Sequence, residues 1–369
     1  MRVLVVGGGV LGSMHAWFAL QRGSEVVQLE REPAARGASV RNFGLVWVSG
    51  RADGAELEAA QRSRDLWEQL GAEVPGLGFR PSGSITVLRT DAEHAVAEVA
   101  AASDTAASRG VELLNADDVR RVNPAVRGTL RGGLWCRRDA VVEPRTAQVA
   151  LRAALNARDG YTWLPGREVR DAGTGWVRDD RGDRHAADLV VLCPGAWLTG
   201  LVRELSPHVP VRRVRLQLMQ TEPLDEQLTT SIADGDSLRY YPAYDSATLD
   251  DAQPQEPVAA EHGMQLLMVQ RLDGSLTIGD THAYDEPFDF DVDEYLYDHL
   301  IAVSTAILGR PLPPVRRRWA GVYAQTLDRG LLVHREEVLP GVWLVTGPGG
   351  RGMTCAPAIA EKTANDLEW

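Results

Sequence analysis

The sequence predicts an α/β fold, α+β overall, in which a parallel sheet shares the chain with a second, mostly antiparallel sheet. Residues 3–6 and most of 188–193 are continuous apolar runs, typical of parallel strands covered on both faces. From residue 214 to about 318 the pattern changes to short strands separated by turn signals. Because 369 residues exceed one typical domain, we expect two domains.

The first strand runs into a glycine-rich turn with the spacing of a dinucleotide-binding motif. Gly7 suits the tight turn, Gly9 allows close approach of a pyrophosphate, and Gly12 allows the helix to pack closely on the strand. Val10 and Leu11 open that helix, whose N-terminal N–H groups attract phosphate. Residues 26–29 read as the next strand. It ends at Glu30, which suits a ribose diol and disfavours a 2'-phosphate, so we expect a Rossmann-like domain binding FAD or NAD rather than NADP.

Composition narrows the class of protein. A net charge of −12 argues against nucleic-acid and anionic-membrane partners. Three scattered cysteines (Cys136, Cys193 and Cys355) predict neither a disulfide framework nor a metal cluster, so no metal is expected. The first strand begins at Arg2, which leaves no room for a signal peptide, and no apolar run reaches membrane-spanning length. We therefore expect a cytoplasmic protein.

The remaining helices and strands are predicted from the spacing of apolar residues and from the glycine, proline and polar residues between them. Residues 36–44, rich in small and polar side chains, suit a loop that approaches a ligand. The following elements are expected in chain order: helix 55–71, strand 83–88, helix 91–109, strand 133–136, a helix from Pro144 to 158, strand 188–193, a short strand 239–242, a mobile loop 245–263, strands 266–270 and 276–279, strand 342–346 and a helix from 356.

A second glycine-rich turn, residues 347–354, lies between the last strand and the last helix. It implies that the C-terminus folds back onto the nucleotide-binding domain. We expect that domain to comprise residues 1–82, 140–213 and 319–369, and a substrate-binding domain to comprise residues 83–139 and 214–318.

With these segments placed, the chain resembles the D-amino-acid oxidase superfamily of flavoproteins, particularly the glycine oxidase and sarcosine oxidase group. The residues that carry this resemblance lie in the segments 7–12 with Glu30, 38–44, 191–197, 273–279, 318–321 and 346–357. The loop 38–44 also looks like a branch of the superfamily associated with aminophosphonate breakdown.

The resemblance implies FAD, extended along the Rossmann-like domain with its isoalloxazine ring between the two domains. Gly321 stands where sarcosine oxidases carry the cysteine that holds flavin covalently, so we expect noncovalent FAD. Backbone N–H groups of residues 350–354 are expected to stabilise negative charge on the flavin. The residues expected to contact FAD are Gly7, Gly9, Val10, Leu11, Gly12, Glu30, Arg31, Ser39, Arg41, Asn42, Gly44, Val169, Gly195, Trp197, Gly349, Gly350, Gly352, Met353 and Thr354.

Two positions depart from the family pattern. Tyr323 stands where glycine and D-amino-acid oxidases place a carboxylate-binding arginine, which disfavours a simple α-amino carboxylate substrate. Thr277 replaces the lysine that helps sarcosine oxidases activate oxygen. Because this lysine is absent, fast reaction with oxygen is not implied, and we expect the electron acceptor to be either oxygen or another molecule.

Candidate catalytic residues are Tyr323, Gln325 and Arg351, and candidate substrate-binding residues are Arg41, Tyr240, Tyr323 and Arg351. Arg351 either binds a phosphonate or carboxylate or is a surface arginine paired with an acid. Arg41 is either a pocket anchor or a partner of the FAD pyrophosphate. On a strand, Tyr240 and Tyr241 would face opposite sides, so one would line the pocket and the other join the core. His262 and His282 are expected to be ordinary solvated or hydrogen-bonded residues.

These residues predict FAD-dependent oxidation of a small primary or secondary amine to an imine, which hydrolyses to a carbonyl compound. The expected substrate is an aminophosphonate, such as 2-aminoethylphosphonate or an N-methyl or hydroxylated relative. Three alternatives stay open: an amino acid such as glycine, sarcosine or a D-amino acid; a 2-hydroxy acid; and a non-enzymatic flavin-carrying subunit. The sequence does not predict the oligomeric state.

Overall fold

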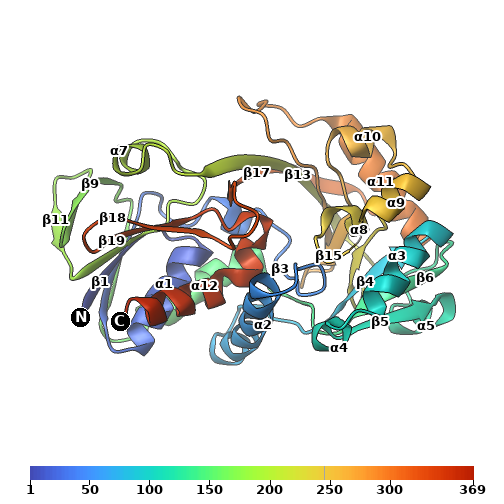
Figure 1. Cartoon of the computed structure of the whole chain (residues 1–369), viewed down its shortest axis with the longest axis horizontal. Helices are drawn as coiled ribbons and strands as arrows, with labels where there is room; N and C mark the ends of the chain where they lie inside the picture. Colours follow the sequence, from blue (N-terminus) through green and yellow to red (C-terminus); the bar gives the residue numbers. More distant parts are fainter. Residues whose placement is uncertain (245) are drawn as a thin grey trace.

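Two large sheets divide the molecule (Figure 1), as the sequence predicts. The structure, a computed structural model, describes residues 1–244 and 246–369. The first sheet has six strands in the order β18-β19-β12-β1-β2-β8, and all but β18 are parallel. Its strands are β1 (Arg2–Val6), β2 (Glu25–Glu30), β8 (Tyr161–Pro165), β12 (Leu189–Leu192), β18 (His334–Leu339) and β19 (Val342–Thr346).

Both faces of this sheet are covered, which explains the continuous apolar runs. Val3 and Val5 point into a core shared with four helices, whereas Leu4 between them packs on the opposite face. The helices are α1 (Val10–Gln21), α2 (Ala55–Glu73), α6 (Pro144–Asn156) and α12 (Gly352–Asp366). The opposite face is covered by β9 (Val169–Gly173), β10 (Trp176–Asp179), β11 (Arg184–Ala186) and α7 (Leu201–Leu205).

The second sheet has eight strands in the order β17-β13-β16-β15-β14-β4-β6-β5, and only the β14–β4 pair is parallel. The prediction of a mostly antiparallel second sheet is therefore confirmed. Its strands are β4 (Ser84–Leu88), β5 (Val111–Asn115), β6 (Gly132–Cys136), β13 (Val211–Pro223), β14 (Ser231–Ala233), β15 (Leu267–Gln270), β16 (Ser275–Gly279) and β17 (Val315–Thr326).

Helix α11 (Glu294–Leu308) buries Leu296, Leu300 and Ile307 against one face of the second sheet. The long strands β13 and β17 reach across the upper part of Figure 1 toward the first sheet. The predicted domain boundaries at 213/214 and 318/319 fall inside these two strands. Those boundaries stay a prediction.

Several predicted elements are wrong in detail. The expected helix 91–109 is interrupted after α3 (Asp91–Ala101) and resumes as α4 (Ala106–Arg109), because the polar residues 103–105 form a turn. The expected strand 239–242 is instead the end of α8 (Ser237–Tyr240). The last helix begins at Gly352 rather than at 356.

The expected mobile loop 245–263 is also wrong for its described part, residues 246–263, because α9 (Ser246–Ala252) and α10 (Pro257–Glu261) form there. Pro257 takes the first turn of α10, where its missing N–H costs nothing. Leu249 of α9 is 1% exposed and packs in the core. Asp245 lies outside the described residues.

Short elements complete the fold. They are the 3-10 turns η1 (Ala38–Val40) and η2 (Gly349–Arg351), the paired strands β3 (Leu45–Val46) and β7 (Ala140–Val141), and the helix α5 (Ala116–Val122). Among the described residues no helix has both the length and the apolar character needed to cross a membrane. Nor does any described cluster of three or more His, Cys, Asp or Glu side chains have the arrangement of a metal site.

Candidate functional site

A cavity of about 770 Å³ lies between the two sheets. Its wall begins at the glycine turn before α1, continues along the loop around η1 and β3, and includes the start of α12. The second sheet contributes residues of β13 and β17. The cavity therefore joins the two glycine-rich turns that the sequence places more than 300 residues apart.

The first glycine turn needs its glycines for packing. Gly7 has φ +114°, and a Cβ there would stand 2.3 Å from the Cys193 carbonyl oxygen. A Cβ on Gly12 would stand 2.1 Å from the Gly7 carbonyl oxygen, so any side chain would push α1 away from β1. Gly9 faces the cavity, where only the Ser39 hydroxyl is nearby.

Two polar side chains hold this turn in shape. Glu30 accepts hydrogen bonds from the Gly8 N–H (2.6 Å) and the Glu32 N–H (2.9 Å). The Ser39 hydroxyl accepts one from the Val10 N–H (2.9 Å) at the start of α1. Because the helix start is open to the cavity and its rim carries no side chain at Gly9, the turn fits the pyrophosphate of a dinucleotide.

The loop after β2 is organised by Asn42, which donates to the Ala38 carbonyl (2.8 Å) and accepts from the Gly44 N–H (2.6 Å). Gly44 has φ +71° and pairs closely with Val142. The Arg41 guanidinium donates to the carbonyl oxygens of Arg36 (2.9 Å) and Ala320 (3.1 Å) and does not line the cavity. Its position does not support a pocket anchor.

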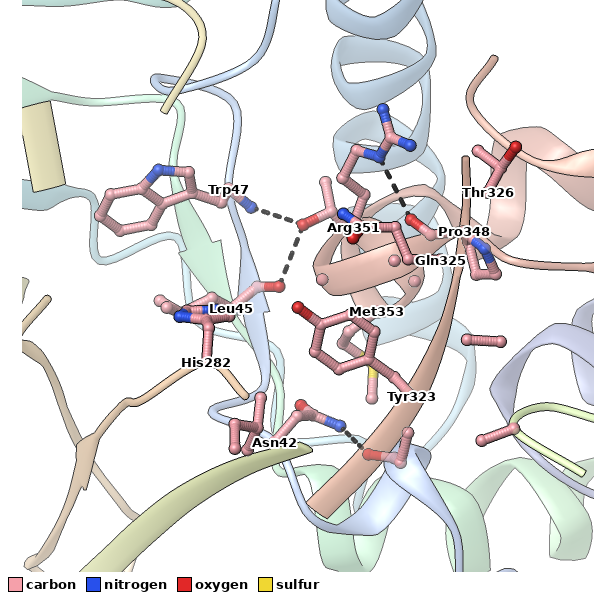
Figure 2. A pocket seen from close by; sticks show the side chains of 18 of the residues that line it. Asn42, Leu45, Trp47, His282, Tyr323, Gln325, Thr326, Pro348, Arg351 and Met353 are labelled. Atoms are coloured by element: carbon pink, nitrogen blue, oxygen red, sulfur yellow. Dashed lines mark hydrogen bonds between the residues drawn. The ribbon is translucent and has the colours of Figure 1, made fainter. Parts of the chain in front are cut away.

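The second glycine turn is tied to distant elements. The Thr354 hydroxyl accepts from the Trp47 N–H (2.9 Å) and donates to the Leu45 carbonyl (3.2 Å), which joins α12 to β3 (Figure 2). A Cβ on Gly350 would lie 3.7 Å from the Tyr240 hydroxyl and 3.9 Å from the Tyr323 hydroxyl. Gly349, Gly352 and Met353 also line the cavity.

Arg351 forms an ion pair with Glu56 (2.7 Å), and both side chains are mostly buried. It also donates to the carbonyl oxygens of Pro348 (3.2 Å) and Leu331 (3.1 Å). Figure 2 shows its guanidinium pointing away from Tyr323. Arg351 is therefore paired with an acid, although it still borders the cavity.

Aromatic rings form one wall of the cavity. Tyr240 stacks on His282 with ring centroids 4.5 Å apart and meets Tyr241 edge-on at 5.1 Å. Both tyrosines line the cavity, so the expected division into one pocket and one core residue is wrong, because α8 replaces the strand. His282 was expected to be an ordinary hydrogen-bonded residue. It does bond, through Nδ1, to the Gly263 carbonyl (2.8 Å), but it also lies in the cavity wall.

Tyr323 projects from β17 across the cavity toward Leu45 and His282 (Figure 2). It is 8% exposed, and its hydroxyl has no hydrogen-bond partner among the residues that the structure describes. Burial raises the pKa of Tyr323 well above its usual value, and burial likewise raises the pKa of Tyr240. Both hydroxyls therefore stay protonated at neutral pH and can donate hydrogen bonds.

Sequence reasoning missed four arginines of the cavity wall, and one of them, Arg239, is paired with Asp236 and Asp250. Arg51 donates to the Trp47 carbonyl (2.9 Å) and lies 3.7 Å from Glu56. Arg212 of β13 donates to the Gln325 side-chain oxygen (3.0 Å) and stacks 4.2 Å from the Tyr284 ring. Arg329 is exposed at the cavity rim. The β13–β17 register, which places Arg212 opposite Gln325, could have identified Arg212, but that register is a property of the fold.

Other predicted contacts lie farther from the cavity. Arg31 stacks over the Trp197 ring at 3.9 Å, so the structure brings these two residues together outside the lining. Val169 is 7% exposed in β9, behind the first sheet. Gly195 does line the cavity and accepts a hydrogen bond from Thr346 (2.9 Å). Thr277, in the middle of β16, does not line it.

Comparisons with known proteins agree with this architecture. A sequence model of the protein family described as FAD dependent oxidoreductase matches residues 2–365. The chain is 24% identical over 382 residues to a glycine oxidase of Bacillus licheniformis, covering 98% of this chain and 91% of that one. It is 32% identical over 248 residues to a D-amino-acid oxidase of Streptomyces coelicolor, covering 65% of each. The crystal structure of glycine oxidase from Geobacillus kaustophilus superposes with a TM-score of 0.80 at 20% identity, covering 100% and 95% of the two chains.

Proposed function

The chain belongs to the FAD-dependent oxidoreductase family, and from this premise we propose that it oxidises the C–N bond of a small primary or secondary amine to an imine, which water converts to a carbonyl compound. The observation that carries the proposal is the cavity between the two glycine turns, whose wall combines buried tyrosines with arginines. The glycine and D-amino-acid oxidases named among its relatives support an amine substrate.

When bound, FAD supplies an acceptor for the hydride that leaves the carbon next to nitrogen. We assign its phosphates to the turn from Gly7 to Gly12 and its ribose to Glu30, which would exchange its bond to the Gly8 N–H for the diol. The turn η2 and the start of α12 line the same cavity, and the first N–H groups of the helix have no partner within it. These roles follow from position and chemistry.

The FAD is proposed to be noncovalent. A Cβ on Gly321 would contact Leu216 and Arg41, and Gly321 itself has no nucleophilic side chain. Acid precipitation of the purified holoenzyme is expected to release yellow FAD into the supernatant. Flavin that remains with the pellet would contradict noncovalent binding.

Tyr323 and Tyr240 are proposed to orient the substrate. Their hydroxyls converge near Gly350, where the substrate would meet the cofactor. Gln325 is proposed to act through Arg212, because its side-chain oxygen accepts the Arg212 Nε–H. This bond holds the guanidinium against β17 while its two remaining nitrogen atoms can meet an acidic group.

For the substrate we propose a small aminophosphonate, such as 2-aminoethylphosphonate or an N-methyl or hydroxylated relative. Arg212 and Arg329 form no ion pair with any residue that the structure describes, in contrast to Arg351. A phosphonate dianion matches the donor geometry of guanidinium groups. We therefore assign the acidic end of the substrate to Arg212 and Arg329 and give Arg351 a positioning role at the second glycine turn.

An α-amino acid is the second candidate, because the named relatives act on glycine and D-amino acids and Arg212 could also hold a carboxylate. Anaerobic mixing of the holoenzyme with aminophosphonates, glycine, sarcosine, D-alanine and 2-hydroxy acids separates the candidates. We expect the aminophosphonates to bleach the flavin fastest. Faster bleaching by an amino acid would reject the phosphonate assignment, and bleaching by hydroxy acids alone would reject amine oxidation.

The substitution Arg212→Gln tests the anchor. We expect KM for the aminophosphonate to rise about 30-fold, corresponding to about 2 kcal/mol, because a charge-assisted contact is lost. KM for propylamine, which carries no acidic group, should change little. Arg351→Gln is the matched control, and equal increases of KM in the two variants would contradict the assignment.

A further inference from the structure

Asp280 is a buried carboxylate in the cavity wall, and the amine oxidation proposed above gives it no role. It follows the last residue of β16, and its backbone N–H donates to the Gln265 carbonyl (2.9 Å), which fixes its position. The residue is 5% exposed. Its Oδ1 has no hydrogen-bond partner within the part of the chain that the structure describes. An unpaired buried carboxylate oxygen costs stability unless a ligand satisfies it.

The neutral ring of His282 presents an acceptor, not a donor, to the Asp280 carboxylate. Its Nδ1 lies 2.8 Å from the Gly263 carbonyl oxygen, which can only accept, so the ring proton sits on Nδ1. The opposite nitrogen, Nε2, lies 3.8 Å from Asp280 Oδ2 and then carries a lone pair. His282 Nε2 is thus placed to accept a proton that Asp280 releases.

The titratable groups around Asp280 are four tyrosines and one histidine, which come from three parts of the chain. Tyr240 and Tyr241 face it from the end of α8, His282 and Tyr284 from the segment after it, and Tyr323 from β17. Two arginines of the cavity wall contact tyrosine rings of this group: Arg212 stacks on Tyr284, and Arg51 lies 5.8 Å from the Tyr241 ring. A carboxylate beside four tyrosine rings has the chemistry of an organic-ammonium site.

We propose that Asp280 receives the ammonium group of the substrate and removes one of its protons, so that the cavity converts a bound zwitterion into the neutral amine that oxidation requires. The inference rests on the proposed amine oxidation. The ammonium N–H bond breaks and its electron pair stays on nitrogen, while an O–H bond forms on Asp280. Asp280 then passes this proton to His282 Nε2, which becomes an imidazolium and releases the proton to solvent. The step needs no oxidant.

The arrangement also selects the substrate. Arg212, which stacks on Tyr284, and Asp280, which lies 3.8 Å from His282, place a positive and a negative group in the wall of one cavity. A zwitterion satisfies both, whereas a 2-hydroxy acid or a plain phosphonate leaves Asp280 unpaired. Burial raises the pKa of the Asp280 carboxyl, and His282 opposes that rise. A proton taken from an ammonium group is therefore held more firmly than on an exposed aspartate.

The test is Asp280→Asn in the FAD-loaded enzyme, with Asp273→Asn as a control that removes the same charge outside the cavity. We expect kcat/KM for the aminophosphonate to fall at least 100-fold at pH 7.5 in Asp280→Asn. Its activity should then rise tenfold per pH unit up to the pKa of the free amine, because only substrate that is already neutral reacts. The control should keep the wild-type profile. An unchanged pH profile in Asp280→Asn would overturn the inference.

Binding supplies a readout independent of turnover. 3-Phosphonopropionate, an anion without an ammonium group, is titrated against the visible flavin spectrum. We expect it to bind Asp280→Asn at least tenfold more tightly than the wild type, and to bind the wild type more tightly as the pH falls and Asp280 is neutralised. The second measurement needs no variant. Equal affinities and no pH dependence would contradict the inference, whereas failure of every amine to reduce wild-type flavin would reject the proposed function itself.

Discussion

The two glycine-rich turns are built alike, strand to turn to helix, yet they are held in place by different means. The first, residues 7–12, depends mainly on close backbone packing, since a Cβ on Gly12 would strike the Gly7 carbonyl, and Glu30 and Ser39 add hydrogen bonds from nearby segments. The second, residues 347–354, depends on side chains of other elements, among them Thr354 to β3 and Arg351 to Glu56 of α2. The first turn is therefore held mostly by the fit of its own backbone, whereas the second is held by side-chain contacts from α12 to β3 and from η2 to α2.

The largest expected effect follows from the first turn. Gly12→Ala should destabilise the protein by about 3 kcal/mol, because its Cβ would stand 2.1 Å from a backbone oxygen that cannot move without shifting β1. We also expect it to purify without FAD, measured by the ratio of visible to ultraviolet absorbance. Gly350→Ala is the matched variant of the second turn, since its Cβ meets nothing closer than 3.7 Å. If Gly350→Ala lost FAD as well, the contrast between the turns would fail.

Arg351→Gln probes the second turn through its ion pair. Glu56 would keep a mostly buried charge whose remaining cation, Arg51, lies 3.7 Å away. We expect the free energy of unfolding to fall by about 2 kcal/mol, and denaturant titration measures this loss. Glu56→Gln combined with Arg351→Gln should recover part of this loss. A double variant as unstable as the sum of the two single variants would show that the pair is not coupled.

Thr354→Val and Ser39→Ala compare hydroxyl groups in the two turns. Thr354→Val leaves the Trp47 N–H buried without an acceptor and should cost about 1 to 2 kcal/mol. Ser39→Ala removes an acceptor at a helix start that is open to the cavity, where water can replace it, so about 0.5 kcal/mol is expected. Thermal unfolding of the two variants measures the order. The reverse order would mean that the first turn carries the tighter junction.

The smallest effect on stability is expected from Tyr323→Phe. The hydroxyl makes no well-formed hydrogen bond among the described residues and has the Tyr240 hydroxyl as a polar neighbour, so its removal should change the unfolding temperature little. If Tyr323 orients the substrate as proposed, losing this hydrogen bond of about 1 kcal/mol should lower kcat/KM about fivefold. Steady-state kinetics with the aminophosphonate measures this. A drop in unfolding temperature with unchanged kinetics would show that Tyr323 is structural.

The same difference explains what could be predicted from the sequence. Gly7, Gly9, Gly12 and Glu30 follow one another at fixed spacing, so the first turn and the parallel sheet could be identified directly. Asp280 carries no local signal, because it lies in the cavity wall only after β16 pairs with β15. The pattern of short runs between turn signals predicts a strand for Tyr240 and Tyr241, but tertiary packing overrides this local preference.

Charge pairing is a further limit of sequence reasoning. The sequence marks Arg351 and Arg212 equally as cations, and only the fold shows that Arg351 already faces Glu56 whereas Arg212 meets Gln325. Which arginine is available to a ligand is set by its neighbours in space. No spacing rule within one chain supplies that information.

The β13–β17 ladder carries a consequence for how such a cavity can diversify. Tyr323 and Gln325 point to one side of β17 because alternate residues of a strand share a face. A single inserted residue before them would turn both side chains out of the cavity and separate Gln325 from Arg212. Substitutions on this strand keep that register and can alter the accepted substrate, whereas insertions and deletions break it. Natural variation in specificity should therefore appear here as changes of residue identity at constant strand length.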